Sequence, residues 1–188
     1  MRLDAFHPEH VVILDEAYID FGGESAVKLI NEYPNLLVIQ TLSKSRSLAG
    51  LRVGMAFGQE DLIEGLERVK NSFNSYTLDW IALAGAKAAL EDEDCFRETC
   101  RNVIRTREWT VKRLEELGGS VIESKANFVM MTHPAIPAKR LFEELREQGI
   151  LVRYFAQPRI DNYVRVSIGT NEEMKQVVDA VRKIGGII

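Results

Sequence analysis

The chain has 188 residues, of which 46% are hydrophobic and 28% are charged, and its formal net charge is −4. These values are ordinary for a soluble globular protein with one core or two small domains, and the lack of a basic block argues against a nucleic-acid-binding surface. No apolar run reaches the roughly 20 residues of a membrane-spanning helix, and the opening MRLDAFHPEH lacks the apolar region of a secretory signal.

The cysteines and histidines give no sign of a disulfide framework or a metal site. Cys95 and Cys100 lie five residues apart and form no CxxC pair, which suits a reducing cytoplasm. The three histidines, His7, His10 and His133, are scattered without the spacing of metal ligands, so we expect no bound metal.

The first part of the chain predicts pieces of a parallel α/β sheet. The run VVILDEAY (11–18) is continuously apolar until its acidic residues, which is typical of a strand buried on both faces. SAVKLINEY (25–33) predicts an amphipathic helix with Ser25 as its N-cap, and LLVIQT (36–41) predicts a second buried strand. Strand, helix and strand form a βαβ unit, whose crossover is right-handed by strong preference.

One more strand and three helices are expected next. VGMAFG (53–58) follows the second strand too closely for a parallel crossover, so we expect an antiparallel or a more distant strand. EDLIEGLERVK (60–70) predicts an amphipathic helix. Residues 74–90 predict a helix that is apolar on most sides and therefore buried, and residues 94–117 predict a long charged helix.

The remaining sequence has the pattern of a small α+β domain. It predicts strands at 128–132, 150–155 and 163–169 and helices at 137–149 and 171–185, after Gly118 and Gly119 end the long helix. The last strand alternates apolar and polar residues, which is typical of a sheet covered on one face. We therefore expect two domains: residues 1–95 form part of a large doubly wound α/β domain, and residues 96–188 form a linking helix and the small domain.

Polar side chains gather where the two predicted parallel strands end. Asp15 closes the first strand, and Tyr18 follows it. Ser43, Lys44 and Arg52 follow the second strand. Because ligands bind at the carboxyl ends of parallel strands, we expect these side chains to face one crevice.

This set of side chains matches the functional groups of pyridoxal 5′-phosphate (PLP). A lysine amine condenses with an aldehyde, and a carboxylate that keeps the pyridine nitrogen protonated makes the ring a better electron sink. A tyrosine serves the phenolic oxygen, and an arginine with a hydroxyl binds the phosphate. Singly, such residues are more commonly turn formers, solvated side chains or surface ion pairs; their combination on one rim favours the cofactor. A Walker phosphate loop is excluded, because no GxxxxGK[ST] occurs.

The motifs VVILDEAYIDF (11–21) and TLSKSRSLAGLRVG (41–54) resemble those of fold-type-I PLP-dependent enzymes of the class-II aminotransferase group, and most of all the histidinol-phosphate aminotransferase family. ANFV, GILVR and YVRVSIGT extend the resemblance into the second domain. The resemblance implies an α/β fold that combines part of the large doubly wound domain with the small α+β domain. It also implies amino transfer from L-histidinol phosphate to 2-oxoglutarate in histidine biosynthesis, by a cytoplasmic homodimer.

The resemblance gives each cofactor residue a role. Lys44 would hold the cofactor covalently and then shuttle a proton. Asp15 would pair with the ring nitrogen, and Tyr18 would hydrogen-bond the ring oxygen. Ser43 and Arg52 would hold the cofactor phosphate.

Three residues of the small domain match substrate-binding positions of the family. Arg165 would bind the anionic end of the substrate, Arg153 would help to hold the substrate phosphate, and Asn127 begins a strand near the substrate. An exposed arginine on a polar strand face is the simpler interpretation of Arg165 alone. A second arginine on the neighbouring strand favours an anion site.

The resemblance covers only about the C-terminal half of such an enzyme. The N-terminal arm, the glycine-containing phosphate loop, the aromatic residue that stacks on the ring and the asparagine that partners the tyrosine have no counterpart here. Three strands also leave the faces and edges of the large sheet without cover. The alternatives are therefore a truncated, non-catalytic domain that self-associates, and a related PLP-dependent aromatic aminotransferase or phospho-amino-acid decarboxylase.

Overall fold

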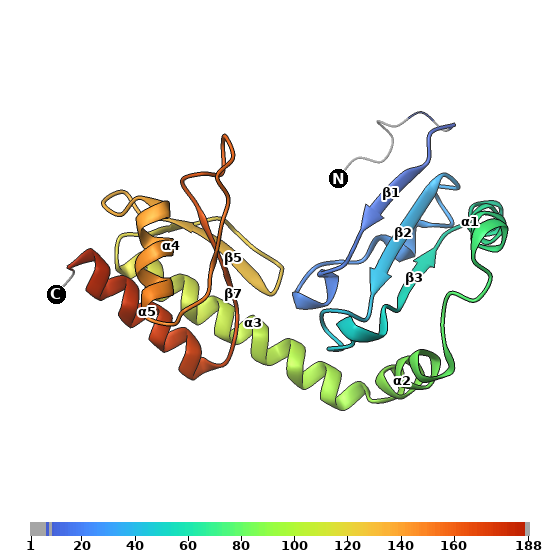
Figure 1. Ribbon diagram of the computed structural model, residues 1–188. Helices are drawn as coiled ribbons and strands as arrows, with labels where there is room; N and C mark the ends of the chain where they lie inside the picture. Colours follow the sequence, from blue (N-terminus) through green and yellow to red (C-terminus); the bar gives the residue numbers. More distant parts are fainter. Residues whose placement is uncertain (1–6, 8, 187–188) are drawn as a thin grey trace. The chain divides into compact units, whose positions relative to one another are not determined.

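The computed structural model describes residue 7 and residues 9–186, and the chain divides into two compact units, Met1–Glu98 (unit 1) and Thr99–Ile188 (unit 2) (Figure 1). The point of division lies within the long helix α3 (Glu93–Glu116). Among the described residues, none of the helices combines the length and the apolar character that a bilayer crossing requires.

Unit 1 contains a three-stranded sheet in the order β1-β2-β3. β1 (Val12–Asp15) runs parallel to β2 (Leu36–Thr41), and β3 (Gly54–Phe57) runs antiparallel to β2. The register pairs Asp15 with Ile39, so β1 and β2 end toward the same edge of the sheet. The predicted parallel pair is confirmed. Of the two arrangements expected for the third strand, antiparallel or more distant, the structure shows the antiparallel one, and the β2–β3 connection is too short for a parallel crossover.

The helix predicted over residues 25–33 is wrong in kind and length. A single 3-10 turn, η3 (Ala26–Leu29), stands there, and Ser25 caps it by accepting a hydrogen bond from Val27 N at 3.2 Å. The apolar residues of the segment still pack against the inner face of the sheet, which explains the helix-like pattern. Their burial comes from an irregular turn that a buried carboxylate, Glu16, ties to the end of β1 by accepting from Ala26 N at 2.6 Å.

Two helices follow β3 along the chain and precede α3 (Figure 1). They are α1 (Glu60–Phe73) and α2 (Trp80–Glu91). α3 confirms the predicted long helix, and Gly118 follows it with a φ of 87°, in the left-handed region that glycine tolerates. The chain can therefore turn sharply there into the first strand of unit 2.

The prediction for residues 74–90 is wrong in two respects. The helix begins only at Trp80, after Asp79 caps it by accepting from Ala82 N at 2.7 Å. Its apolar surface is also mostly exposed: Trp80 is 87% exposed, and within the helix only Ala82 and Ala86 are buried. A helix that is apolar on most sides is normally an interior helix, so this exposure calls for an explanation.

Unit 2 is built on a four-stranded antiparallel sheet in the order β4-β5-β7-β6. Its elements are β4 (Ser120–Val121), β5 (Phe128–Thr132), α4 (Ala138–Glu147), β6 (Arg153–Tyr154), β7 (Val164–Ser167) and α5 (Asn171–Gly185). The alternation predicted for the last strand is confirmed, because Val164, Val166 and Ile168 are buried. β6 is shorter than predicted, and the two-residue edge strand β4 carried no pattern that could predict it.

The last helix, α5, begins with a capping box. Thr170 Oγ1 accepts from Glu173 N at 3.2 Å, and Glu173 Oε2 accepts from Thr170 N at 2.7 Å. The hydrogen bond from the Thr170 backbone, aided by that with its side chain, lowers the pKa of the Glu173 carboxyl below its ordinary value. This local cap fixes the start of α5 together with a tertiary hydrogen bond from Thr106 Oγ1 to Asn171 Oδ1 at 2.8 Å.

Candidate active site

A closed loop after β2 carries Lys44. Leu42 N donates to Val53 O at 3.1 Å, and Leu48 N donates back to Leu42 O at 3.0 Å, which closes the loop at its neck. Ser47 N donates to Lys44 O at 3.2 Å, and Ser47 adopts a φ of 56°. The lysine therefore sits in a defined turn that its neighbours fix, although it follows a stretch of small polar residues.

The structure brings the lysine amine and the tyrosine ring together. Lys44 Nζ lies 5.4 Å from the centroid of the Tyr18 ring, and both side chains are half-buried. Tyr18 follows Asp15, which closes the neighbouring parallel strand. Asp15 is exposed, and its Oδ1 accepts from Ala17 N at 3.0 Å. An amine, a phenol and a carboxylate thus share one edge of the sheet.

Ser43 and Arg52 lie at opposite ends of the same loop, next to its neck. Thr41 Oγ1 is 2.8 Å from Ser43 Oγ and 3.2 Å from Val53 O, so it links the two ends. Arg52 is exposed, has a φ of 56°, and donates from Nη1 to Ala49 O at 2.9 Å. The sequence interpretation missed Thr41, although a hydroxyl at the last position of a strand was a visible signal.

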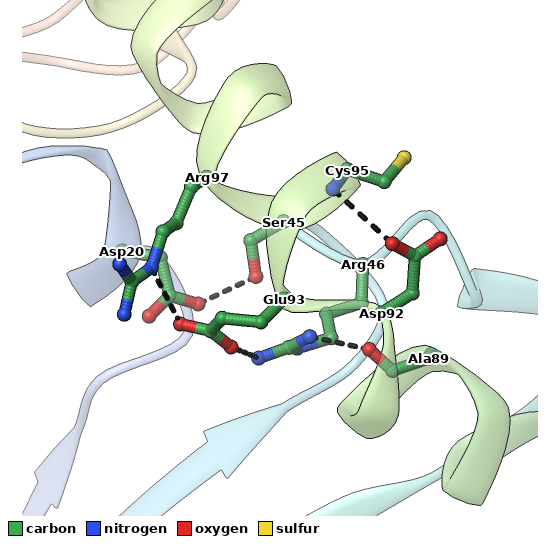
Figure 2. Close-up of polar contacts among 8 residues, drawn as sticks. All are labelled: Asp20, Ser45, Arg46, Ala89, Asp92, Glu93, Cys95 and Arg97. Carbon is green, nitrogen blue, oxygen red and sulfur yellow. Dashed lines mark hydrogen bonds and ion pairs between the residues drawn. The ribbon is translucent and has the colours of Figure 1, made fainter.

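Ser45 and Arg46 anchor the lysine turn (Figure 2). The buried Ser45 Oγ donates to Asp20 Oδ2, which ties the turn to the segment after β1. Arg46 Nη1 donates to Ala89 O near the end of α2, and Arg46 Nη2 lies 3.5 Å from Glu93 Oε2 at the start of α3. Figure 2 shows these contacts converging on the Lys44 loop from three separate segments.

The arginine anchor also has an aromatic and an ionic partner. The Arg46 guanidinium lies 3.7 Å from the centroid of the Phe96 ring, a cation–π distance. Glu93 also accepts from Arg97 Nε at 2.9 Å. The hydrogen bond from Arg97, together with that from Arg46, lowers the pKa of the Glu93 carboxyl. Sequence reasoning missed this cluster, because its members lie up to 51 positions apart in the chain (97 − 46 = 51).

Unit 2 pairs the two predicted substrate arginines directly. Arg153 in β6 lies opposite Arg165 in β7 in the sheet register. The Arg165 guanidinium lies 5.2 Å from the Phe128 ring centroid, and that of Arg153 lies 5.5 Å from the Phe155 ring centroid. Like charges directly opposite in a sheet destabilise it, so an anion bound beside this pair would relieve the repulsion.

Arg165 also has a buried donor that no protein group satisfies. Of the buried side-chain nitrogen and oxygen atoms in the described part of the chain, only Arg165 Nε has no hydrogen-bond partner. A buried unsatisfied donor of a charged group is costly, and it points to a missing acceptor. The arginine pair therefore has both the charge and the open donor that an anion requires.

Asn127 lies just before β5, where its carbonyl accepts from Ile168 N at 2.8 Å and extends the sheet ladder. The preceding carbonyl, that of Ala126, accepts from Arg107 Nη1 at 2.8 Å. Arg107 is buried, and its desolvation lowers the pKa of the guanidinium. The start of β5 is thus held by a residue that sequence reasoning had placed only within the long helix.

The donor set of unit 1 fits the chemistry of PLP. The half-buried lysine lies beside the tyrosine ring, the exposed carboxylate has one oxygen engaged only locally, and a hydroxyl and a guanidinium flank the loop neck. Within the described residues, no group of three His, Cys, Asp or Glu side chains could hold a metal ion.

Residues 4–181 match the family model described as aminotransferase class I and II. The histidinol-phosphate aminotransferase of Clostridium acetobutylicum is 58% identical over 178 residues, which are 95% of this chain and 51% of that relative. The enzyme of the same name from Marinomonas sp. (strain MWYL1) is also 58% identical, over 180 residues, with the same shares of both chains. The chain spans about half the length of the curated relatives it matches, in agreement with the predicted partial resemblance.

Two solved structures show the same fold. The histidinol-phosphate aminotransferase from Clostridium acetobutylicum gives a TM-score of 0.89 at 23% identity, over 99% of this chain and 57% of that chain. The enzyme from Sinorhizobium meliloti, solved in complex with pyridoxal 5′-phosphate, gives a TM-score of 0.85 at 22% identity, over 97% and 50% of the two chains. The predicted fold class is confirmed, and with the match over residues 4–181 the chain belongs to the aminotransferase class I and II family.

Proposed function

We propose that this chain is part of a PLP-dependent aminotransferase that moves the amino group of L-histidinol phosphate to 2-oxoglutarate in histidine biosynthesis. The observation that carries the proposal is the position of Lys44 Nζ, 5.4 Å from the Tyr18 ring at the strand edge that Asp15 closes. The 58% identity to histidinol-phosphate aminotransferases supports the substrate. The PLP in the Sinorhizobium meliloti structure supports the cofactor.

PLP, when bound, supplies an electron sink that stabilises negative charge at the carbon that bears the amino group. The Asp15 carboxylate would pair with the pyridine nitrogen and keep it protonated. The Tyr18 hydroxyl would donate a hydrogen bond to the phenolic oxygen. Lys44 would hold the cofactor covalently through Nζ, and the freed Nζ would then carry a proton between the two carbons that exchange it.

The neck of the Lys44 loop would bind the cofactor phosphate. Ser43 and Arg52 lie at the two ends of this loop, and Thr41 links those ends. A guanidinium fork and a hydroxyl are suitable partners for a phosphate dianion. The anchors at Ser45 and Arg46 fix the turn between these groups, so that the lysine keeps its orientation.

The arginine pair of unit 2 would bind the anionic group of the substrate. Arg165 offers a buried Nε without an acceptor, and Arg153 lies opposite it in the sheet. Arginine is suited to this role, because its planar fork matches a carboxylate or a phosphate. Asn127, at the start of β5, would act near the same substrate.

The large-domain part would comprise residues 1–95, and the linking helix with the small domain residues 96–188. We further propose that the enzyme is a cytoplasmic homodimer. Cys95 and Cys100 form no disulfide in the described part of the chain, which is in keeping with that compartment. Sedimentation of the enzyme and fractionation of its host cells would test these two points.

The proposal is tested by the absorbance of the purified chain with added PLP. We expect a band near the edge of the visible range that borohydride bleaches, and that the Lys44→Ala variant lacks. The absence of a band, or an equal band in the variant, would contradict the role of Lys44. Histidinol phosphate, phenylalanine, aspartate and threonine phosphate, each offered with 2-oxoglutarate, would then identify the substrate. Carbon dioxide release from threonine phosphate would support a decarboxylase instead.

A further inference from the structure

Unit 1 exposes far more large apolar side chains than unit 2. Of the fourteen large hydrophobic residues that are exposed in the described part of the chain, twelve lie in unit 1 and only Ile122 and Leu151 lie in unit 2. Contiguous exposed apolar surface on a folded protein marks a site of interaction. The surplus in unit 1 therefore indicates a surface that another polypeptide covers.

One face of the unit 1 sheet makes up a defined part of this surface. Ile13 in β1 is 57% exposed, and Ile39 in β2 is 37% exposed, whereas Leu37, the register partner of Ile13 on the same face, is buried. The register places Ile39 directly beside Ala56 of β3, which is also exposed. We name these three exposed residues the open sheet face. The opposite face, by contrast, packs against η3 and forms a small core.

Asp15 lies at the margin of the open sheet face. It pairs with Ile39 in the parallel register, and directly paired residues of neighbouring strands project to the same face of a sheet. Among the described residues, no strand pairs with the outer side of β1, and a hollow of about 360 Å³ runs between this edge and the segment of η3. The carboxylate proposed for the cofactor nitrogen thus stands in water, next to an apolar face and an open strand edge.

The helix α2 also exposes large apolar side chains, on another part of unit 1. Trp80 is 87% exposed and Ile81 is 75% exposed, although the helix is apolar on most sides. Unpaired edges and apolar helix surfaces are features that complete α/β domains cover. The open sheet face and α2 therefore both have the apolar composition of surfaces that another segment covers.

We propose that the open sheet face binds a polypeptide equivalent to the part of histidinol-phosphate aminotransferases that lies outside the match, and that this docking covers Asp15. Those relatives are about twice as long as the matched region, so each of them carries a further segment of nearly the same length. A second copy of this chain fits the face less well. A two-fold interface joins identical patches, so it would bring two Asp15 carboxylates to one apolar interface without a cation.

The docking has a consequence for the cofactor, which rests on the proposed function. A carboxylate exposed to water pairs weakly with a cation, because solvent screens the attraction. Covering Asp15 removes that screening and strengthens its pairing with a protonated pyridine nitrogen. The complete site therefore holds PLP more tightly than the 188-residue chain alone.

The test measures association without PLP. The 188-residue chain is mixed with the part of the Clostridium acetobutylicum relative that lies outside the match, and the complex is followed by sedimentation and calorimetry. We expect a 1:1 complex whose Kd rises at least tenfold in Ile13→Lys. The control Ile122→Lys places the same change at a residue of similar exposure, 50% against 57%, in unit 2, and it leaves the Kd unchanged. Ala56→Arg repeats the test from β3, and circular dichroism verifies that each variant folds.

A Kd that Ile13→Lys and Ala56→Arg leave unchanged, or the lack of any complex, overturns the proposal. Self-association that the same variants abolish also overturns it, because a second copy then covers the face. PLP is added last, and we expect the complex to bind it at least tenfold more tightly than the chain alone. A complex that forms without binding PLP supports the docking surface and contradicts the proposed function, so the two are tested separately.

Discussion

The two units differ in how they bury their apolar residues. Unit 2 gathers seventeen buried residues into one continuous core around its sheet and helices. Unit 1 has two separate clusters, with four and two buried residues, and leaves most of α2 exposed. Unit 2 thus buries its apolar residues in a core of its own, while unit 1 leaves many of its large apolar side chains exposed. Lys44, the proposed catalytic lysine, lies in unit 1.

The core of unit 2 gives the largest expected effect. Leu145 is fully buried, so Leu145→Ala should lower the free energy of unfolding of unit 2 by about 2–5 kcal/mol, through lost burial and the cavity left behind. Hydrogen exchange with mass spectrometry assigns the loss to one unit. Leu83→Ala is the matched control in unit 1, where the side chain is 46% exposed, and it should change stability by less than about 0.5 kcal/mol. Equal losses would contradict the contrast between the units.

The anchor of the lysine turn should have the next largest effect. Arg46→Met removes a charged donor whose side chain is only 11% exposed, and should cost about 1.5–3 kcal/mol in unit 1. Faster hydrogen exchange over residues 43–48 would report the loosened turn. Arg97→Met removes the other partner of Glu93, whose side chain is 66% exposed, and should have little effect. If the two variants behave alike, Arg46 does not hold the turn.

The capping box of α5 should have a smaller effect, confined to unit 2. Thr170→Ala removes the cap and should cost about 1 kcal/mol, measured by urea unfolding. The lowered pKa of Glu173 means that its contribution is present above the unfolded pKa and is lost as the pH falls through the folded pKa. The difference between wild type and Glu173→Ala should therefore shrink in acid, below the ordinary value of 4.5. A stability difference between the two proteins that persists in acid would exclude a stabilising role for the ionised Glu173 carboxylate.

The arginine pair should have the smallest effect on stability, and of opposite sign. Arg165→Met removes an unsatisfied buried donor and the repulsion with Arg153, so unit 2 should gain up to about 0.5 kcal/mol. Inorganic phosphate should raise the melting temperature of the wild type and not that of this variant. Arg159→Met, on the exposed loop between β6 and β7, is the control and should keep the response to phosphate. Loss of the response in both variants would contradict a specific anion site.

Much of the fold could be predicted, because it rests on local patterns. Continuous apolar runs predicted the parallel pair β1 and β2, and the alternation of apolar and polar residues predicted that β7 is buried on one face only. The short connection before β3 excluded a parallel neighbour and left two arrangements open, of which the structure shows the antiparallel one. The exposure of α2 could not be predicted, because its apolar composition predicts an interior helix, whereas only Ala82 and Ala86 of this helix are buried.

The candidate site was predictable in part for the same reason. Asp15, Tyr18 and Lys44 follow strand ends, so the parallel register alone predicted one edge for them. The contacts that fix the lysine turn were not predictable. Arg46 reaches Ala89 and Glu93 only once α2 and α3 are in place, and no spacing in the sequence encodes that meeting.

The central claim is that Lys44 is the residue that binds PLP covalently. The most direct measurement treats the chain with an equimolar amount of PLP, reduces it with borohydride and maps the pyridoxyl group by mass spectrometry of its peptides. We predict that Lys44 carries the label under conditions that leave Lys87 and Lys139, whose side chains are 76% and 71% exposed, unmodified. A label spread over the exposed lysines, with Lys44 not favoured, would contradict the account.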